Sequence, residues 1–163
     1  MQENTMVLRD GRTLGYDVYG DRQGVPLILL HGTPGSRVWF LEDDETAKKL
    51  GVYLIATDRP GYGLSSALKN RTLLHYANDI EQLANHLQLD TFALLGVSGG
   101  GAFAAAIAHR LRERVTVCNL VSTATPFING KPSKYMAKEN RIAFFLSKHL
   151  PFIIKLSNKA QKK

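Results

Sequence analysis

The stretch Gly96-Val97-Ser98-Gly99-Gly100 constrains the fold of this chain more than any other. It follows the apolar run 92–95 and precedes a segment rich in small residues, 102–114. This order predicts a buried strand, a very sharp turn and a helix, the arrangement known as a nucleophile elbow. Only glycines flank such a turn closely, and the turn lifts the serine hydroxyl clear of the sheet. We therefore predict that Ser98 is a nucleophile, and that Gly100 allows the helix to pack closely on the strand.

The rest of the chain alternates short apolar runs with helical patterns. Strands are predicted over 25–30, 52–56, 92–95 and 115–121, after a hairpin of two strands, 6–9 and 13–19, around Asp10-Gly11. Helices are predicted over 38–50, 72–88 and 101–114. Strands that alternate with helices favour an α/β fold with a mostly parallel sheet and helices on both faces.

Two more loops follow buried strands, His31-Gly32-Thr33-Pro34-Gly35 after the first and 58–65 after the second. Ligands of open α/β sheets bind beyond the carboxyl ends of the strands, where all three loops are expected. Acyl transfer needs a nucleophile beside donors that hold the developing oxyanion, and the Gly99 N–H suits that task at the start of its helix. The loops therefore predict a site for attack on a carbonyl group.

Together, the segments 31–35, 58–65 and 96–100 resemble the motifs of the α/β-hydrolase superfamily, in particular its proline-iminopeptidase-like enzymes and small-molecule esterases. The resemblance covers residues 6–126. It implies an α/β-hydrolase fold and a serine hydrolase that acts on a small ester, amide or peptide-like substrate. It also implies that Ser98 is the nucleophile and that the backbone N–H groups of Gly99 and Thr33 form the oxyanion hole.

The resemblance gives the other motif residues supporting roles. His31 is expected to be structural, since the family gives it no proton-transfer role. Asp58 is expected to shape its loop and the floor of the pocket. Arg59 is expected to brace the loop or face solvent, with contact to a substrate carboxylate as the alternative. The expected residues of the pocket loops are His31, Gly32, Pro34, Gly35, Asp58, Arg59, Gly61, Gly63, Gly96 and Gly100.

The catalytic base and its acid are missing from the sequence at the places where the superfamily carries them. Its order along the chain is serine, then Asp or Glu, then His, yet no Asp follows Ser98. The acids after that point are Glu113 and Glu139, and the histidines are His109 and His149. His109 lies eleven residues into the helix, about 16 Å away, which is too far to act. The others match no family position, so we expect this chain to be nearly inactive by itself.

We expect residues 1–130 to form the N-terminal part of a hydrolase core and 131–163 to begin an incomplete helical cap. The fold then stops before its last strands, which leaves the strand 115–121 at an exposed edge. Such an edge predicts self-association or pairing with a missing C-terminal half. A truncated gene product, an incomplete sequence and one half of a split protein all fit this pattern.

The net charge of +7 is concentrated in the tail. Residues 131–163 carry +8, whereas residues 1–130 carry −1, so a spread-out nucleic-acid-binding face is excluded. The single cysteine, Cys118, and the absence of clustered ligands predict no disulfide, no metal and no cofactor. No apolar run reaches membrane-spanning length and no secretory signal is visible, so we predict a cytoplasmic protein.

Two other functions stay open. The missing base and acid favour a non-catalytic binding or interaction protein built on half of a hydrolase fold. The basic, aromatic tail suggests attachment to a membrane surface, although Pro151 and the scattered lysines argue against one amphipathic helix.

Overall fold

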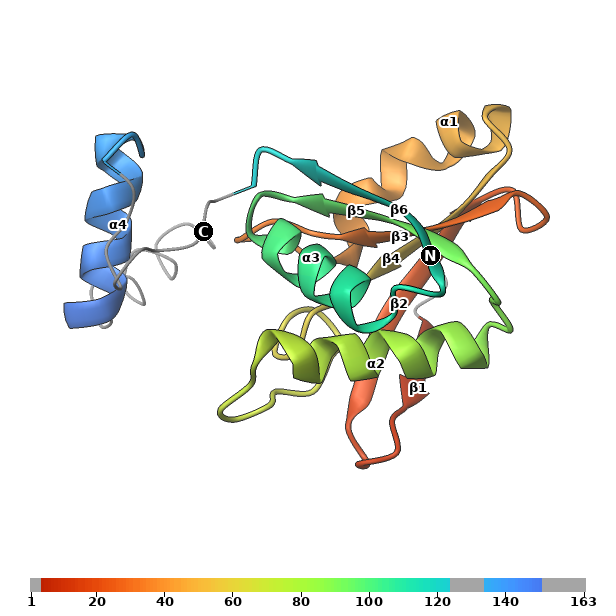
Figure 1. Ribbon diagram of the computed structural model, residues 1–163, viewed down its shortest axis with the longest axis horizontal. Helices are drawn as coiled ribbons and strands as arrows, with labels where there is room; N and C mark the ends of the chain where they lie inside the picture. Colours follow the sequence, from red (N-terminus) through yellow and green to blue (C-terminus); the bar gives the residue numbers. More distant parts are fainter. Residues whose placement is uncertain (1–3, 124–133, 151–163) are drawn as a thin grey trace. The chain divides into compact units, whose positions relative to one another are not determined.

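The computed structural model describes residues 4–123 and 134–150. Contacts divide the chain into two units, Met1–Ala124 and Thr125–Lys163. Within the described residues, the first unit holds one six-stranded sheet (Figure 1). Its strands are β1 (Asn4–Val7), β2 (Thr13–Gly20), β3 (Val25–Leu30), β4 (Val52–Thr57), β5 (Phe92–Val97) and β6 (Val115–Val121).

The strand order is β1-β2-β4-β3-β5-β6. β2 runs antiparallel to β1 and to β4, whereas β4, β3, β5 and β6 are parallel, so the predicted hairpin and mostly parallel sheet are confirmed. Leu30, the last residue of β3, pairs with Thr57 on one side and with Gly96 on the other. The three loops singled out in the sequence therefore leave the sheet side by side at one edge.

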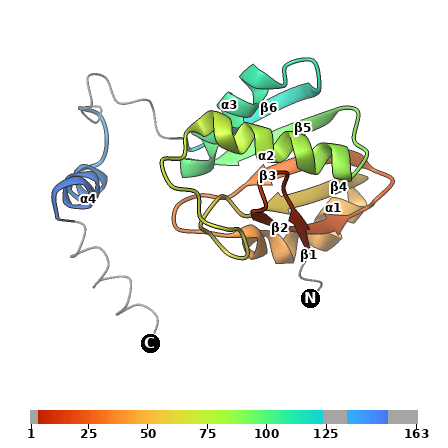
Figure 2. The same ribbon diagram turned by 90° about the horizontal axis from the view of Figure 1, so that it is seen from below.

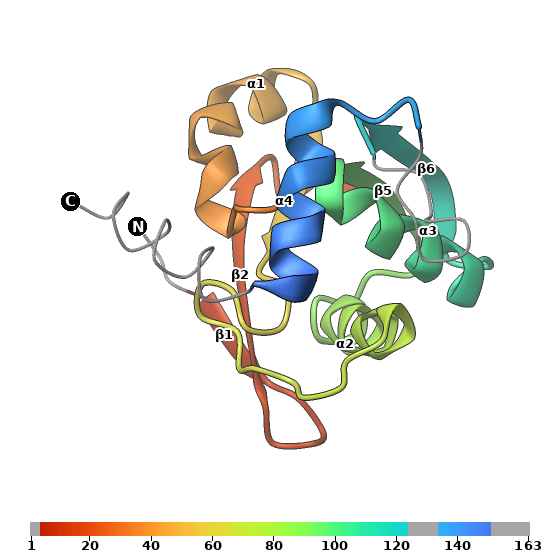
Figure 3. The same cartoon turned by 90° about the vertical axis from the view of Figure 1, so that its left-hand side faces the viewer.

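Helices cover both faces of the sheet (Figures 1 and 3). α2 (Leu73–His86) and α3 (Gly101–Arg110) lie on one face, and Figure 2 shows α2 in front of the strands. Ile80 of α2 and Ile107 of α3 are fully buried there in one core cluster with Leu94. The 3-10 helix η1 (Arg37–Asp43) and α1 (Asp44–Lys49) lie on the other face, where Ala47 is buried with Leu54.

The helices differ most from the predicted ones in two places, and α2 differs by only one or two residues at its ends. The segment predicted as one helix over 38–50 begins as a 3-10 helix and becomes α-helical only from Asp44. α3 ends at Arg110, four residues before the predicted end. There the N–H groups of Arg114 and Val115 both donate to the carbonyl of Leu111, which turns the chain back toward β6.

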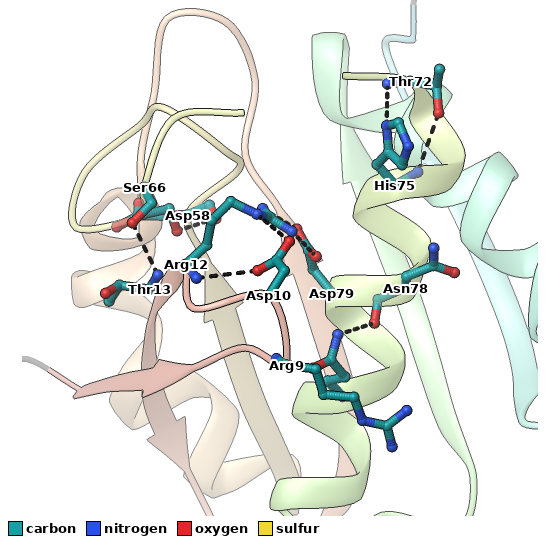
Figure 4. Close-up of polar contacts among 12 residues, drawn as sticks. Arg9, Asp10, Arg12, Thr13, Asp58, Ser66, Thr72, His75, Asn78 and Asp79 are labelled. Carbon is teal, nitrogen blue, oxygen red and sulfur yellow. Dashed lines mark hydrogen bonds and ion pairs between the residues drawn. The ribbon is translucent and has the colours of Figure 1, made fainter. Parts of the chain in front are cut away.

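Polar contacts hold the β1–β2 hairpin against α2 (Figure 4). The Arg12 guanidinium donates to both carboxylate oxygens of Asp79 on α2, at 2.6 and 2.9 Å, and to Asp10 in the turn at 2.7 Å. α2 itself begins with a capping box, in which Thr72 and His75 each accept a hydrogen bond from the other's backbone N–H. The bonds between Arg12 and Asp79 thus attach the β1–β2 hairpin to α2.

β6 lies at the edge of the sheet and, within the described residues, pairs only with β5. Val117, Leu120 and Val121 on this strand are each about half exposed. The predicted exposed edge is therefore present.

In the second unit, α4 (Lys138–His149) is the described helix. Its assignment to a cap stays a prediction, and Pro151 lies outside the described residues. No helix in the described part of the chain is long and apolar enough to cross a membrane.

Candidate active site

Ser98 lies in the turn between β5 and α3. Its φ of +50° is in the left-handed region, which a residue with a Cβ adopts only at an energetic cost. The turn begins a short 3-10 helix, η2 (Ser98–Gly100), which α3 continues from Gly101. Ser98 is partly exposed, at the end of the sheet.

Close packing surrounds this turn. A Cβ on Gly100 would lie 2.1 Å from the carbonyl oxygen of Leu30, and one on Gly96 would lie 2.6 Å from the Cα of Gly101. No side chain fits at either position. The absence of side chains at these glycines lets the start of α3 pack directly on β3 and β5, as the sequence predicted for Gly100.

The first loop lies against the turn. A Cβ built on Gly99 would lie 2.6 Å from Thr33 Oγ1 and 3.5 Å from Thr33 N, and one on Gly32 would lie 3.4 Å from Ser98 Cβ and 3.2 Å from the Trp39 ring. Thr33 and Pro34 are exposed, whereas Gly32 is buried. The structure therefore brings the predicted nucleophile and both predicted oxyanion donors together.

His31 is fully buried beneath the first loop. Its Nε2 accepts the Arg59 N–H at 3.2 Å, so the ring proton is on Nδ1, which donates to the Gly32 carbonyl at 2.8 Å. Burial is the main cause that lowers the pKa of His31 to about 4. A neutral ring with both nitrogens engaged braces the loop, which agrees with the structural role expected for it.

Arg59 is buried, with 3% of its surface exposed. Its Nη2 donates to the Gly32 carbonyl at 2.8 Å and to Thr33 Oγ1 at 2.7 Å, and its Nη1 lies 3.4 Å from the Gly99 carbonyl. The guanidinium also lies over the ring of Tyr62, 4.7 Å from the centroid. The expectation that Arg59 faces solvent is wrong, because these contacts enclose its side chain. The contacts instead agree with the expectation that Arg59 braces the loop.

Asp58 stabilises the backbone of two loops. Its carboxylate accepts hydrogen bonds from the backbone N–H groups of Arg37 and Leu64, and from the Arg37 guanidinium at 2.9 Å. Gly63, at φ +47°, passes so close that a Cβ would overlap this carboxylate. Asp58 is fully buried, and its carboxylate holds the backbone of its own loop at Leu64.

Arg37 is a site-supporting residue that the sequence analysis did not single out. Its guanidinium is buried between Asp58 and Asp17, with a 3.0 Å contact to the Asp17 carboxylate. No local pattern marks it, because its partners lie 20 residues before and 21 residues after it along the chain.

Within the first unit, neither of the residues considered for the base and the acid lies beside Ser98. His109 is exposed in the last turn of α3, and Glu113 is exposed beyond the end of that helix, where it contacts Arg112 at 3.1 Å. Glu139 and His149 are exposed on α4 in the second unit. In the described part of the chain, no group of three or more His, Cys, Asp or Glu side chains is arranged to hold a metal ion.

Comparisons with known proteins agree with this geometry. The family model for the alpha/beta hydrolase fold matches residues 25–160. The chain is 31% identical over 132 residues to the uncharacterized hydrolase YcgS of Bacillus subtilis, which covers 80% of this chain and 45% of that protein. It is 39% identical over 101 residues to the proline iminopeptidase of Lactobacillus helveticus, which covers 56% of this chain and 34% of that enzyme.

A solved structure shares the architecture. The esterase from Exiguobacterium antarcticum superimposes with a TM-score of 0.74 at 25% identity, covering 97% of this chain and 60% of the esterase. The chain thus spans less than half the length of these two curated relatives and 60% of this structural one. It belongs to the α/β-hydrolase superfamily, as its three loops predicted.

Proposed function

We propose that this chain supplies the nucleophile and the oxyanion hole of a serine hydrolase that acts on a small ester, amide or peptide-like substrate. The observation that carries this proposal is the strained, partly exposed Ser98 beside Thr33 and Gly99. A residue held in the left-handed region needs support from its surroundings, and such strain clusters at active sites. The named hydrolases and esterase among the relatives support the same reaction class.

In the proposed reaction, Ser98 Oγ attacks the substrate carbonyl carbon while a base takes the hydroxyl proton. The carbonyl oxygen becomes an oxyanion, and the N–H groups of Gly99 and Thr33 donate to it. The leaving alcohol or amine departs with that proton, and water then hydrolyses the acyl-serine. The base and its acid come from residues other than His109, Glu113, Glu139 and His149.

A non-catalytic binding protein is the alternative, because no Asp follows Ser98 in the sequence. The two functions differ in whether position 98 can be acylated. The natural serine needs a base, but a thiol at the start of a helix ionises readily without one. We therefore choose Ser98→Cys as the test, in a Cys118→Ala background that removes the native thiol.

The experiment compares two reactions of the full 163-residue chain. Acylation by p-nitrophenyl acetate passes through an oxyanion, whereas alkylation by iodoacetamide does not. We expect the ratio of the acylation rate to the alkylation rate to exceed the same ratio for N-acetylcysteine by about 10-fold or more. The reason is that one oxyanion donor is worth about 10²–10³ in rate. A ratio equal to that of the free thiol contradicts the proposal.

The unsubstituted chain provides a second check. Loss of a triad base removes on the order of 10⁶ in turnover, so we expect almost no hydrolysis of p-nitrophenyl acetate. Enzyme-like turnover that Ser98→Ala abolishes would contradict the expectation that the base lies outside this chain.

A further inference from the structure

Arg59 is a buried cation whose Nη1 and Nη2 groups contact the serine turn and the first loop. Two of its hydrogen bonds reach Gly32 and Thr33, and a third, longer contact reaches Gly99. No carboxylate of the described residues forms an ion pair with it, and burial lowers the pKa of the guanidinium. A buried charge without a counterion is costly, so its neutral contacts require an explanation.

The hydrogen bond from Arg59 to the Gly32 carbonyl also orients the N–H of the next residue, Thr33. Gly32 C=O and Thr33 N–H belong to the same planar trans peptide unit, so they point in opposite directions. Two donors hold this carbonyl on the inner side of the loop, Arg59 Nη2 and His31 Nδ1, each at 2.8 Å. The Thr33 N–H must then point away from Arg59, and it donates to no acceptor among the described residues.

The peptide unit that carries the other donor is fixed in a different way. The Ser98 carbonyl accepts the Gly101 N–H at the start of α3, which orients the Ser98–Gly99 peptide within the helix backbone. Gly99 is in the first turn of this helix, where N–H groups have no acceptor within the helix. The Gly99 N–H is thus oriented by backbone bonds alone, whereas the orientation of the Thr33 N–H depends on the side chains of Arg59 and His31.

We propose that Arg59 is a positioning residue that, with His31, holds the Gly32–Thr33 peptide in the orientation that directs the Thr33 N–H toward an oxyanion formed at Ser98. The backbone of Arg59 contributes as well, because its N–H bonds to His31 Nε2 and so keeps the ring proton on the nitrogen that faces Gly32. The Arg59 guanidinium also donates to the Thr33 hydroxyl, so it holds the side chain of Thr33 as well as the peptide before it. This inference rests on the function proposed above.

The test uses the Ser98→Cys, Cys118→Ala chain and adds Arg59→Gln. We expect the acylation rate by p-nitrophenyl acetate to fall by about 10-fold or more, up to the 10²–10³ that one oxyanion donor is worth. Alkylation by iodoacetamide should change less than about 2-fold, because it forms no oxyanion. A parallel loss of both rates would indicate general damage to the turn and would overturn the proposal.

Arg71→Gln is the matched control. Arg71 also braces the second loop, by donating to the Pro60 carbonyl, and it also lies over the Tyr62 ring, but it makes no contact with Gly32 or Thr33. Its removal should leave the ratio of the two rates unchanged. An equal drop in both variants would mean that any loosening of this loop suffices, which contradicts a specific role for Arg59.

Two measurements keep the proposal testable if Arg59→Gln does not fold. Arg59→Lys retains the charge, but its ammonium group lies closer to the backbone than Nη2 and lacks the planar fork that spans Gly32 and Thr33, so the ratio should fall here too. A crystal structure of the unsubstituted chain should show the Gly32 carbonyl bonded to Arg59; a carbonyl turned to solvent overturns the inference. If the Ser98→Cys chain has no acylation advantage at all, the proposed function fails, whereas an advantage that survives Arg59→Gln refutes only the role of Arg59.

Discussion

At the scale of single residues, the serine turn is strained and its neighbours leave it little freedom. Ser98 adopts φ +50° between β5 and α3, and the backbone of Gly100 touches that of Leu30. Strain of this kind costs of order 1–3 kcal/mol and is tolerated where the surrounding structure fixes the conformation. The free energy of unfolding should therefore record the strain directly.

Ser98→Gly should be more stable than Ser98→Ala by about 1 kcal/mol, because glycine adopts positive φ without a steric penalty. Both variants lose the hydroxyl, so the comparison isolates the backbone. Urea unfolding followed by fluorescence of Trp39, the single tryptophan, measures the difference. At the exposed helical position Ala105, glycine should instead lower the free energy of unfolding by about 1 kcal/mol relative to alanine. If glycine is also less stable than alanine at position 98, Ser98 is unstrained.

His31 makes stability depend on pH. Its pKa is about 4 in the folded chain and 6.5 ordinarily, so the unfolded chain takes up the proton first as the pH falls. The contribution of His31 should therefore lower the free energy of unfolding by about 2 kcal/mol between pH 7 and pH 5. Urea unfolding of the wild type and of His31→Gln at both pH values checks this; an equal pH dependence in the two proteins would contradict a neutral, buried ring.

At the scale of elements, the hairpin and α2 are joined by one charged contact. Arg12 is mostly buried and forms two bonds to Asp79, whose side chain is only 2% exposed. The first two strands lie at one side of the sheet, and β1 pairs only with β2 among the described strands. The ion pair therefore anchors one edge of the sheet, where β1 has a single strand neighbour.

Asp79→Ala should destabilise the fold by about 3 kcal/mol, because it leaves the mostly buried Arg12 guanidinium with only the exposed Asp10 carboxylate as a partner. Lys48 and Glu45 on α1 form an exposed pair, and Glu45→Ala should cost less than about 1 kcal/mol. Replacement of both buried partners, as Arg12→Met with Asp79→Leu, should recover much of the loss. Urea unfolding compares the four proteins, and a small effect of Asp79→Ala alone would refute the anchoring role.

At the scale of the whole molecule, the sheet has an apolar edge. β6 offers Val117, Leu120 and Val121 at roughly half exposure, and its outer backbone groups have no described partner strand. Edges of this kind promote pairing with other chains. This feature is the physical basis for the proposal that the isolated chain self-associates or pairs with a C-terminal half.

We expect the isolated chain to associate in a concentration-dependent manner, and Val117→Lys to shift it toward monomer because a charge on an edge strand opposes pairing. Size-exclusion chromatography with light scattering measures the mass at several concentrations. Leu50→Lys is the matched control, since Leu50 is 71% exposed but lies beyond the end of α1, away from β6. An equal effect of both substitutions would show that surface charge alone controls association.

Local pattern was enough to predict most of the elements. β3 and β6 have the predicted ends, and the paired ends of β3, β4 and β5 follow from the alternation of strands and helices. The C-terminal end of α3 and the 3-10 start of the segment 37–43 were not predictable, because they depend on turns that the packed neighbours select. Arg37 was missed for the same reason, since its two carboxylate partners are distant in sequence.

By itself, the sequence determined the class of fold, the serine turn and the three loops that belong to one edge of the sheet. These features depend on residue type and short spacing, because glycines permit the turn and apolar periodicity places the strands. Only the tertiary structure decided that Arg59 is buried and bonded to Gly32 and Thr33. Burial of a charge depends on which loops meet around it in space, and no local spacing records that.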